Sequence, residues 1–358
     1  MSRLIKYKES LIKFIKERSC LFDETVNPDK NIHTILYSEL KKIDLILPIL
    51  LLTIMNSQNK KNQISLQGYY AASCIQFIQI LLNVFENKSF FISKHGLECY
   101  NTLVNTIIIA SNKSLCQNLE SIKNTVSKEV AVKIYTNIMN IYYDGINYNN
   151  ILNEHKFEIN DKKANGDVSK WYIKNDNDLK DKFSKIVQIN RESFNNYINK
   201  KLGSLCEMTF SLGWCIGCGD DKSVNKIKKI SKYFTMLLKL SYDFKNLDDD
   251  INNNDNNITT NYVLNYGLQD SYELFMYNKQ KFIEECMILD IYTNTVKEIV
   301  NFIEKDVDDI IDQTSPDLKS NFTQQSNVSD LSDVAADLSN VSNVYDVSNV
   351  YDLSIDTK

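Results

Sequence analysis

Residues 226–251 have a helical pattern that constrains the fold of the whole chain. One face of this segment is apolar and consists of Ile227, Ile230, Phe234, Leu237, Leu238, Leu247 and Ile251. A second face is polar and carries, at intervals of four, three and four residues, Lys239, Asp243, Asn246 and Asp250. Such a face is either a solvated helix surface or a metal or phosphate site, to which facing helices of a bundle contribute oxygen ligands.

The scarcity of turn-forming residues predicts an all-α fold. The chain has only 9 glycines and 3 prolines in 358 residues, whereas sheet-rich and dinucleotide-binding folds use more turn glycine. Its 43% hydrophobic content is enough for one large core. The net charge of −5, with most of the acidity late in the chain, argues against a nucleic-acid partner, because nucleic-acid binders carry a basic surplus.

The cysteines and the apolar runs suggest a cytoplasmic protein. The eight cysteines are scattered through a long sequence, so we expect reduced thiols. Cys215-x-x-Cys218 lacks a second pair at zinc spacing, and the surrounding GWCIGCG has the small residues of a close helix crossing. The longest apolar run, residues 45–55, is too short to span a bilayer, so we expect a buried helix and no transmembrane segment.

The hydrophobic pattern predicts one helical domain over residues 1–313. Its predicted helices are 4–15, 31–54, 67–91, 95–111, 121–142, 194–213, 226–251, 272–287 and 294–312. Residues 145–179 are polar and interrupt the pattern, so we interpret them as a variable insertion or long loop. Residues 314–358 repeat Ser-Asn-Val and Tyr-Asp units and predict a disordered acidic tail or, alternatively, a partner-binding one.

Two motifs in the second half of the chain resemble those of a known family. SYDFKNL at 241–247 resembles the second aspartate-rich motif of the trans-isoprenyl diphosphate synthases, in the DDYxNL form of the geranylgeranyl diphosphate synthase branch. KLGSL at 201–205 resembles the KTGxL motif of that family. Between them, GWCIGCG at 213–219 lies where the family has its small-residue helix crossing.

Two motifs in the first half extend the resemblance to roughly residues 30 to 310. NIMNIYY at 137–143 is similar to QxxDIYW, and AASCIQFIQ at 71–79 is similar to AAxxxExIH. The altered motifs and the Asn- and Lys-rich composition also resemble the polyprenyl-synthase-like proteins of large DNA viruses.

The resemblance implies an isoprenoid-synthase-type bundle around a central cavity. It implies condensation of isopentenyl diphosphate with an allylic diphosphate, with Mg²⁺ held between two acidic motifs on facing helices. The implied metal ligands are Glu86, Asp243, Asn246 and Asp250, and the implied catalytic residues are Lys201, Asp243 and Asn246. The implied substrate-binding residues are Lys201, Lys239, Gln76, Gln79, Asn137 and Asn140.

Several positions depart from the family pattern. The register set by Lys201 places Tyr242 at the first aspartate of the second motif and Lys239 at a glutamine one turn earlier. The first aspartate-rich motif is replaced by ENKSF at 86–90, and the arginine of an Arg-Pro pair by Leu47. Asn137 and Asn140 replace Gln and Asp in the middle motif. A lysine four residues from Asp243 can pair with its carboxylate and oppose a cation there.

Three hypotheses remain open. The chain is a working prenyltransferase that binds Mg²⁺ and isoprenyl diphosphates, or a catalytically inert homologue that acts as a binding or regulatory subunit. The family tendency suggests a homodimer in either case, or a heterodimer with an active synthase. The third hypothesis is an unrelated helical bundle. It predicts that Glu86 and Asp243 lie on different sides of the molecule, whereas the family interpretation predicts that they face each other across a cavity.

Overall fold

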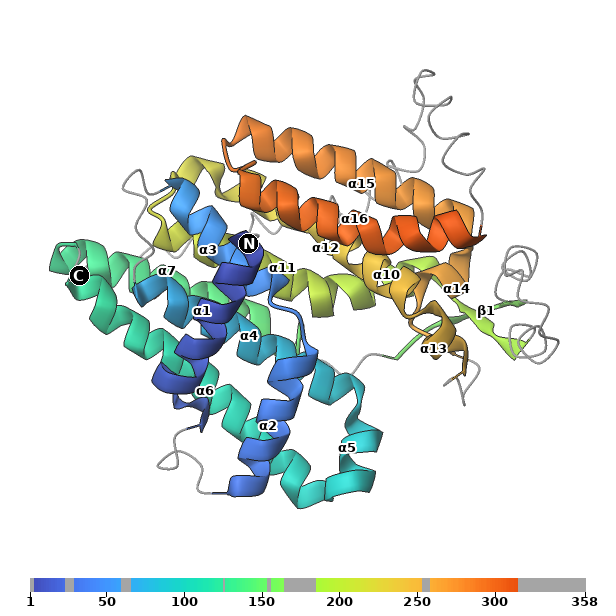
Figure 1. Cartoon of the computed structure of the whole chain (residues 1–358), viewed down its shortest axis with the longest axis horizontal. Helices are drawn as coiled ribbons and strands as arrows, with labels where there is room; N and C mark the ends of the chain where they lie inside the picture. Colours follow the sequence, from blue (N-terminus) through green and yellow to red (C-terminus); the bar gives the residue numbers. More distant parts are fainter. Residues whose placement is uncertain are drawn as a thin grey trace, which may run out of the picture. The chain divides into compact units, whose positions relative to one another are not determined.

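A computed structural model describes residues 3–22, 29–58, 66–124, 126–152, 156–163, 185–252 and 258–314. A compact unit spans Met1–Ile310. Within the described residues this unit is helical apart from one two-stranded sheet, which confirms the predicted all-α class (Figure 1). Most of the predicted tail lies outside the described residues, as do residues 153–155 and 164–179 of the predicted insertion.

The described residues form helices and two short strands. The helical elements are α1 (Arg3–Arg18), η1 (Cys20–Phe22), α2 (Lys30–Lys42), α3 (Ile46–Gln58), α4 (Leu66–Glu86), α5 (Lys88–His95), α6 (Leu97–Lys123), α7 (Lys128–Ile146), α10 (Arg191–Ile198), η2 (Asn199–Gly203), α11 (Ser204–Ile216), η3 (Asp221–Ser223), α12 (Val224–Lys245), α13 (Leu247–Asn252), α14 (Tyr262–Tyr266), α15 (Leu268–Ile288) and α16 (Asn294–Thr314). Strands β1 (Ile159–Lys163) and β2 (Val187–Ile189) pair antiparallel, with Ile159 opposite Ile189.

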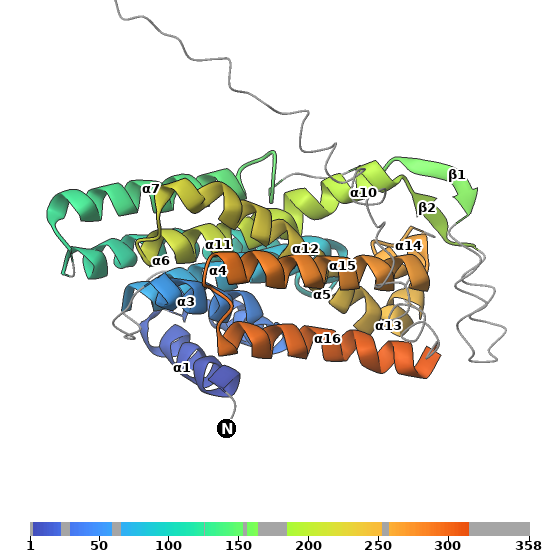
Figure 2. The ribbon, with the colours of Figure 1, turned by 90° about the horizontal axis from the view of Figure 1, so that it is seen from above.

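Helices α3, α4 and α11 form the centre of the core. Helix α4 packs against α3 and α6, and α11 packs against α3, α7 and α12 (Figure 2). The Gly68–Glu86 stretch of α4 has the length and apolar composition of a membrane span, but most of it is buried inside the fold, as in a core helix. The whole apolar run of α3 from Ile46 to Met55 is buried as well.

The crossing of α11 over α3 depends on two glycines. A Cβ on Gly213 would lie 2.8 Å from the main-chain oxygen of Leu51, and one on Gly217 would lie 2.8 Å from that of Met55. These distances leave no room for a side chain, because backbone atoms cannot yield as the end of a side chain can. The prediction that GWCIGCG permits a close helix crossing is therefore confirmed, and the eight cysteines are free thiols.

The predicted helix over 31–54 is wrong in one respect, because the structure has two helices there. Helix α2 ends at Lys42 and α3 begins at Ile46, with Asp44 in the break. Pro48 explains the interruption: proline lacks an N–H and its ring clashes with the carbonyl four residues earlier, so it is tolerated only in the first turn of a helix. The break brings Asp44 to the wall of the central cavity.

Two further predicted helices also end earlier than expected. Helix α4 ends at Glu86, and α5 begins after Asn87 instead of continuing α4 to residue 91. Helix α12 ends at Lys245, where Asn246 caps it before α13 begins. In both places an asparagine stands at the boundary, a residue type whose side chain competes with the helical backbone for hydrogen bonds.

Candidate functional site

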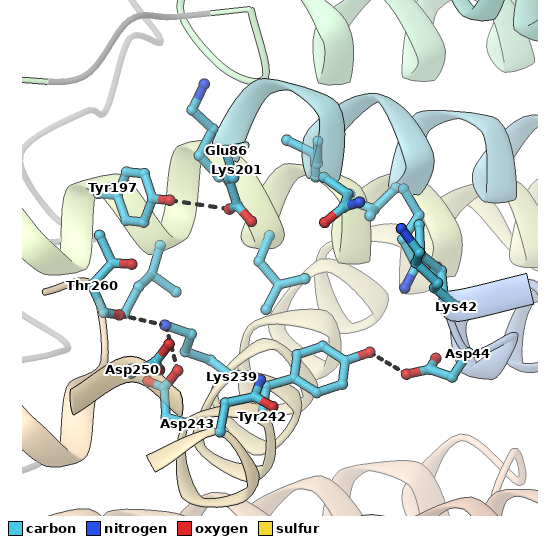
Figure 3. Close-up of a pocket in the computed structure, with 18 residues that line it drawn as sticks. Lys42, Asp44, Glu86, Tyr197, Lys201, Lys239, Tyr242, Asp243, Asp250 and Thr260 are labelled. Atoms are coloured by element: carbon cyan, nitrogen blue, oxygen red, sulfur yellow. Dashed lines mark hydrogen bonds and ion pairs between the residues drawn. The ribbon is translucent and has the colours of Figure 1, made fainter. Parts of the chain in front are cut away.

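A cavity of about 400 Å³ lies between segments that are far apart in the sequence. Its walls come from the α2–α3 junction, the end of α4, the α10–α11 junction, α12, α13 and the segment before α14 (Figure 3). All four predicted metal ligands line it, namely Glu86, Asp243, Asn246 and Asp250. Three of the predicted substrate-binding residues line it as well, namely Lys201, Lys239 and Gln79.

The remaining predicted substrate-binding residues lie elsewhere. Gln76 is fully buried one turn before Gln79, and neither atom of its amide group has a hydrogen-bond partner. Asn137 and Asn140 are on α7, outside the lining of the cavity. Asn140 is exposed and Asn137 is half-buried.

Glu86 and Asp243 lie on opposite walls of the cavity. Glu86 is the last residue of α4, and Asp243 is in the last turn of α12 (Figure 3). This is the arrangement that the isoprenyl synthase interpretation expects and that an unrelated bundle does not. The two helices thus bring together residues that are separated by about half of the compact unit.

The Asp243 carboxylate is fully engaged by the protein. The residue is only 4% exposed. Its Oδ1 accepts a hydrogen bond from Lys239 Nζ at 2.6 Å, and its Oδ2 accepts one from the Tyr262 backbone N–H at 2.6 Å. Burial raises the pKa of Asp243 to about 6, because desolvation disfavours the charged form and the Lys239 and Tyr262 contacts offset only part of this effect.

The segment before α14 holds the partners of Asp243 in place. The carbonyl oxygen of Thr260 accepts a second bond from Lys239 Nζ at 2.6 Å. The Asn261 amide donates to the Asp243 carbonyl at 2.7 Å and to Asp250 Oδ2 at 2.8 Å. Burial raises the pKa of Asp250 too, and the charge of Lys239 partly opposes that rise.

A second buried asparagine fixes this segment from behind. The Asn265 amide donates to the carbonyls of Thr259 and Asn261 at 2.7 and 2.8 Å, and its Oδ1 accepts from the Ile189 N–H of β2 at 2.9 Å. Asn265 is 0% exposed, so these bonds form away from water. The oxygens that surround the Lys239 ammonium are therefore set by the fold around Asn261 and Asn265.

Tyr242 contributes a neutral hydrogen-bond donor to the cavity wall. Its phenol donates to Asp44 Oδ2 at 2.6 Å, while Asp44 Oδ1 accepts from the Ile46 N–H at 3.1 Å at the start of α3. Burial, followed by the neighbouring charge of Asp44, raises the pKa of Tyr242 well above its usual value. The hydroxyl therefore stays protonated at neutral pH and keeps donating to Asp44.

The opposite wall carries few free carboxylate oxygens. Glu86 is exposed at the cavity rim and accepts a bond from the Tyr197 hydroxyl at 3.1 Å. One turn earlier, Asn83 donates to the buried Glu39 Oε2 at 2.7 Å, and Lys42 Nζ lies 2.6 Å from Glu39 Oε1. The α4 wall is thus connected to α2 by amide and ammonium groups.

Lys201 lies in an irregular turn. Helices α10 and α11 are joined by the π-helical segment Asn199–Gly203, a geometry that is frequent at functional sites. This turn brings Lys201 to the cavity wall, where its Nζ donates to the Ile151 carbonyl at 2.7 Å. The sequence gives no sign of this π-helical geometry.

These residues do not fit a magnesium cluster. Mg²⁺ requires near-octahedral oxygen ligands, usually from carboxylates, phosphate and water. In the described ranges no group of three or more Asp, Glu, His or Cys side chains is arranged to hold a metal ion. Both oxygens of Asp243 accept N–H bonds, and an ammonium group lies 2.6 Å from one of them.

The sequence did not point to several residues of the site. Tyr197, Asn83, Thr260 and Asn261 belong to no motif, and their roles depend on tertiary contacts. Only Asp44 had a usable signal, since Pro48 predicts a helix start just after it.

The fold is similar to that of several solved synthases, although no family model and no curated protein matches the sequence. A geranyltransferase from Helicobacter pylori superposes with a TM-score of 0.56 and 11% identity, over 86% of this chain and 99% of that one. A geranyltransferase from Legionella pneumophila superposes with a TM-score of 0.53 and 10% identity, over 86% of this chain and 99% of that one. An FPP/GFPP synthase from Zymomonas mobilis superposes with a TM-score of 0.53 and 9% identity, over 85% of this chain and 99% of that one. The chain therefore has the fold of the isoprenyl diphosphate synthases.

Proposed function

We propose that this chain is a catalytically inert relative of the trans-isoprenyl diphosphate synthases that acts as a binding or regulatory subunit. The observation that carries the proposal is the state of Asp243. It occupies the one acidic position kept from the second motif, and both of its oxygens accept bonds from Lys239 and Tyr262.

Electrostatics explain why this arrangement opposes the reaction. Ionisation of an allylic diphosphate needs cations that stabilise the charge developing on the leaving pyrophosphate. Two unit charges 4 Å apart interact with about 4 kcal/mol at an effective dielectric constant of 20, so an ammonium repels a nearby divalent cation by about 8 kcal/mol. A magnesium ion at Asp243 would have to overcome this repulsion and break two short hydrogen bonds.

The resemblance suggests the branch, the location and the assembly of such a subunit. It favours the geranylgeranyl diphosphate synthase branch and a likeness to the viral polyprenyl-synthase-like proteins. It also favours a cytoplasmic location and a dimer. We propose that the partner is an active synthase of the same fold, with a second copy of this chain as the alternative. The retained cavity supports a binding role, because it stays open although its acidic groups are engaged.

A working Mg²⁺-dependent prenyltransferase is the second candidate. It is favoured by one observation, the convergence of Glu86, Asp243, Asn246 and Asp250 on a single cavity. The test is incorporation of labelled isopentenyl diphosphate into allylic diphosphates of increasing chain length in the presence of Mg²⁺. We expect no product. A product of defined length that disappears in Asp243→Ala would establish the enzyme and refute the inert subunit.

A further inference from the structure

We infer that the Lys239 ammonium serves as a built-in cation in place of a divalent metal, so that the cavity is metal-independent. This inference rests on the proposed function and specifies how its site works. It predicts that removal of the ammonium creates a divalent-cation site from groups already present.

The surroundings of the ammonium are those of a hard cation. Lys239 Nζ lies 2.6 Å from Asp243 Oδ1 and 2.6 Å from the Thr260 carbonyl oxygen. Asp250 lies beside them (Figure 3). Carboxylate and main-chain carbonyl oxygens are the ligands that hard divalent cations take in proteins. The side chain of Lys239 is only 15% exposed, so water screens the ammonium weakly.

The charged groups around Lys239 have a negative net charge. Asp243 and Asp250 carry two negative charges when ionised, and Lys239 supplies one positive charge. Lys239 Nζ is paired with Asp243 Oδ1, whereas Asp250 Oδ2 accepts its hydrogen bond from the neutral amide of Asn261. A divalent cation in place of the ammonium would balance the wall, provided that the lysine were removed.

The oxygen ligands do not depend on Lys239 for their positions. Asn261 holds both Asp250 and the main chain of Asp243, and the Tyr262 N–H holds the other oxygen of Asp243. Asn265 fixes the segment that carries Thr260. A variant without the amine should therefore keep these oxygens in place, which is the condition for metal binding without large rearrangement.

The experiment measures Mn²⁺ binding to the full chain by electron paramagnetic resonance. The variants are Lys239→Ala and Lys239→Gln, with Lys239→Ala/Asp243→Asn to locate the ion. Lys229→Ala is the matched control, because Lys229 is on the same helix but pairs with Glu285 on the exposed side. We expect at least about tenfold tighter Mn²⁺ binding in the single Lys239 variants, no gain in Lys229→Ala, and loss of the gain in the double variant.

Either of two results would overturn the inference. One is Asp243-dependent Mn²⁺ binding by the native chain as tight as that of Lys239→Ala. The other is no gain in both single variants. If a variant unfolds, we test whether Mn²⁺ restores its helical circular dichroism. If Mn²⁺ restores it in neither variant, that result counts against the inference. Mg²⁺-dependent prenyl transfer by the native chain would refute the proposed function and the inference with it, whereas an inactive native chain that binds Mn²⁺ through Asp243 would refute the inference alone.

Discussion

Replacement of Lys239 by methionine should destabilise the fold in a pH-dependent manner. Methionine keeps most of the length of the side chain and removes the charge. The Asp243 carboxylate would then be buried with the backbone N–H of Tyr262 as its remaining hydrogen-bond donor. Removal of one partner of a buried ion pair typically costs about 3–5 kcal/mol, because the other charge is left uncompensated.

The pKa of Asp243 sets the pH range of this effect. In the native chain it is about 6, above the unfolded value of about 3.9, so folding favours the protonated acid. The associated stabilisation is complete below about pH 4 and is lost as the pH rises through 6, at about 1.4 kcal/mol per unit. Lys239 lowers this pKa, so Lys239→Met raises it further and extends the loss above pH 6. Between pH 6 and 8 the variant should lose up to about 3 kcal/mol relative to the native chain.

Urea unfolding followed by circular dichroism from pH 5 to 8 measures this difference. Lys229→Met is the control: Lys229 is 56% exposed and lies 2.8 Å from Glu285, and a surface pair of this kind contributes under about 1 kcal/mol. In a cycle with Asp243→Asn, the double variant should lose much less than the two single changes together. A penalty for Lys239→Met that is independent of pH, or no coupling in the cycle, would refute the reasoning.

Three further substitutions test the structure by chemical denaturation. Gly213→Ala should cost about 1–3 kcal/mol, because its Cβ would lie 2.8 Å from the Leu51 carbonyl; unchanged stability would contradict the close crossing. Tyr242→Phe should cost about 1–3 kcal/mol by removing the donor to Asp44, and a neutral effect would mean that this bond contributes nothing. Asn265→Ala should cost at least about 2 kcal/mol, since three buried main-chain groups lose a hydrogen-bond partner. A cost below about 0.5 kcal/mol would mean that the Asn265 hydrogen bonds do not fix this segment.

The fold class and one wall of the site could be predicted from local pattern. Helical periodicity and scarce glycine and proline determine the class, because an amphipathic helix must bury its apolar face against other helices. The same periodicity placed Lys239 and Asp243 on one face, where an i, i+4 pair is in contact on any regular helix. The end of α12 at Asn246 does not separate Asp250 from Lys239 and Asp243, because the Asn261 amide donates a hydrogen bond to Asp250.

The remainder of the site depends on tertiary contacts that the sequence does not reveal. Tyr197 reaches Glu86 from the last turn of α10, and the carbonyl of Thr260 accepts from Lys239 because of the local path of the main chain. Asn137 and Asn140 occupy motif positions, yet α7 carries both outside the cavity lining. Motif similarity identifies positions along a helix, whereas the packing of that helix decides which of them line a cavity.

The central claim is that this cavity no longer holds a metal-bound diphosphate at Asp243. The most direct test is calorimetric titration of the native chain with inorganic pyrophosphate, in the presence and absence of Mg²⁺, with Asp243→Asn as the control. We expect no Mg²⁺-dependent binding in either protein. Mg²⁺-dependent binding of pyrophosphate by the native chain that Asp243→Asn abolishes would contradict the central claim.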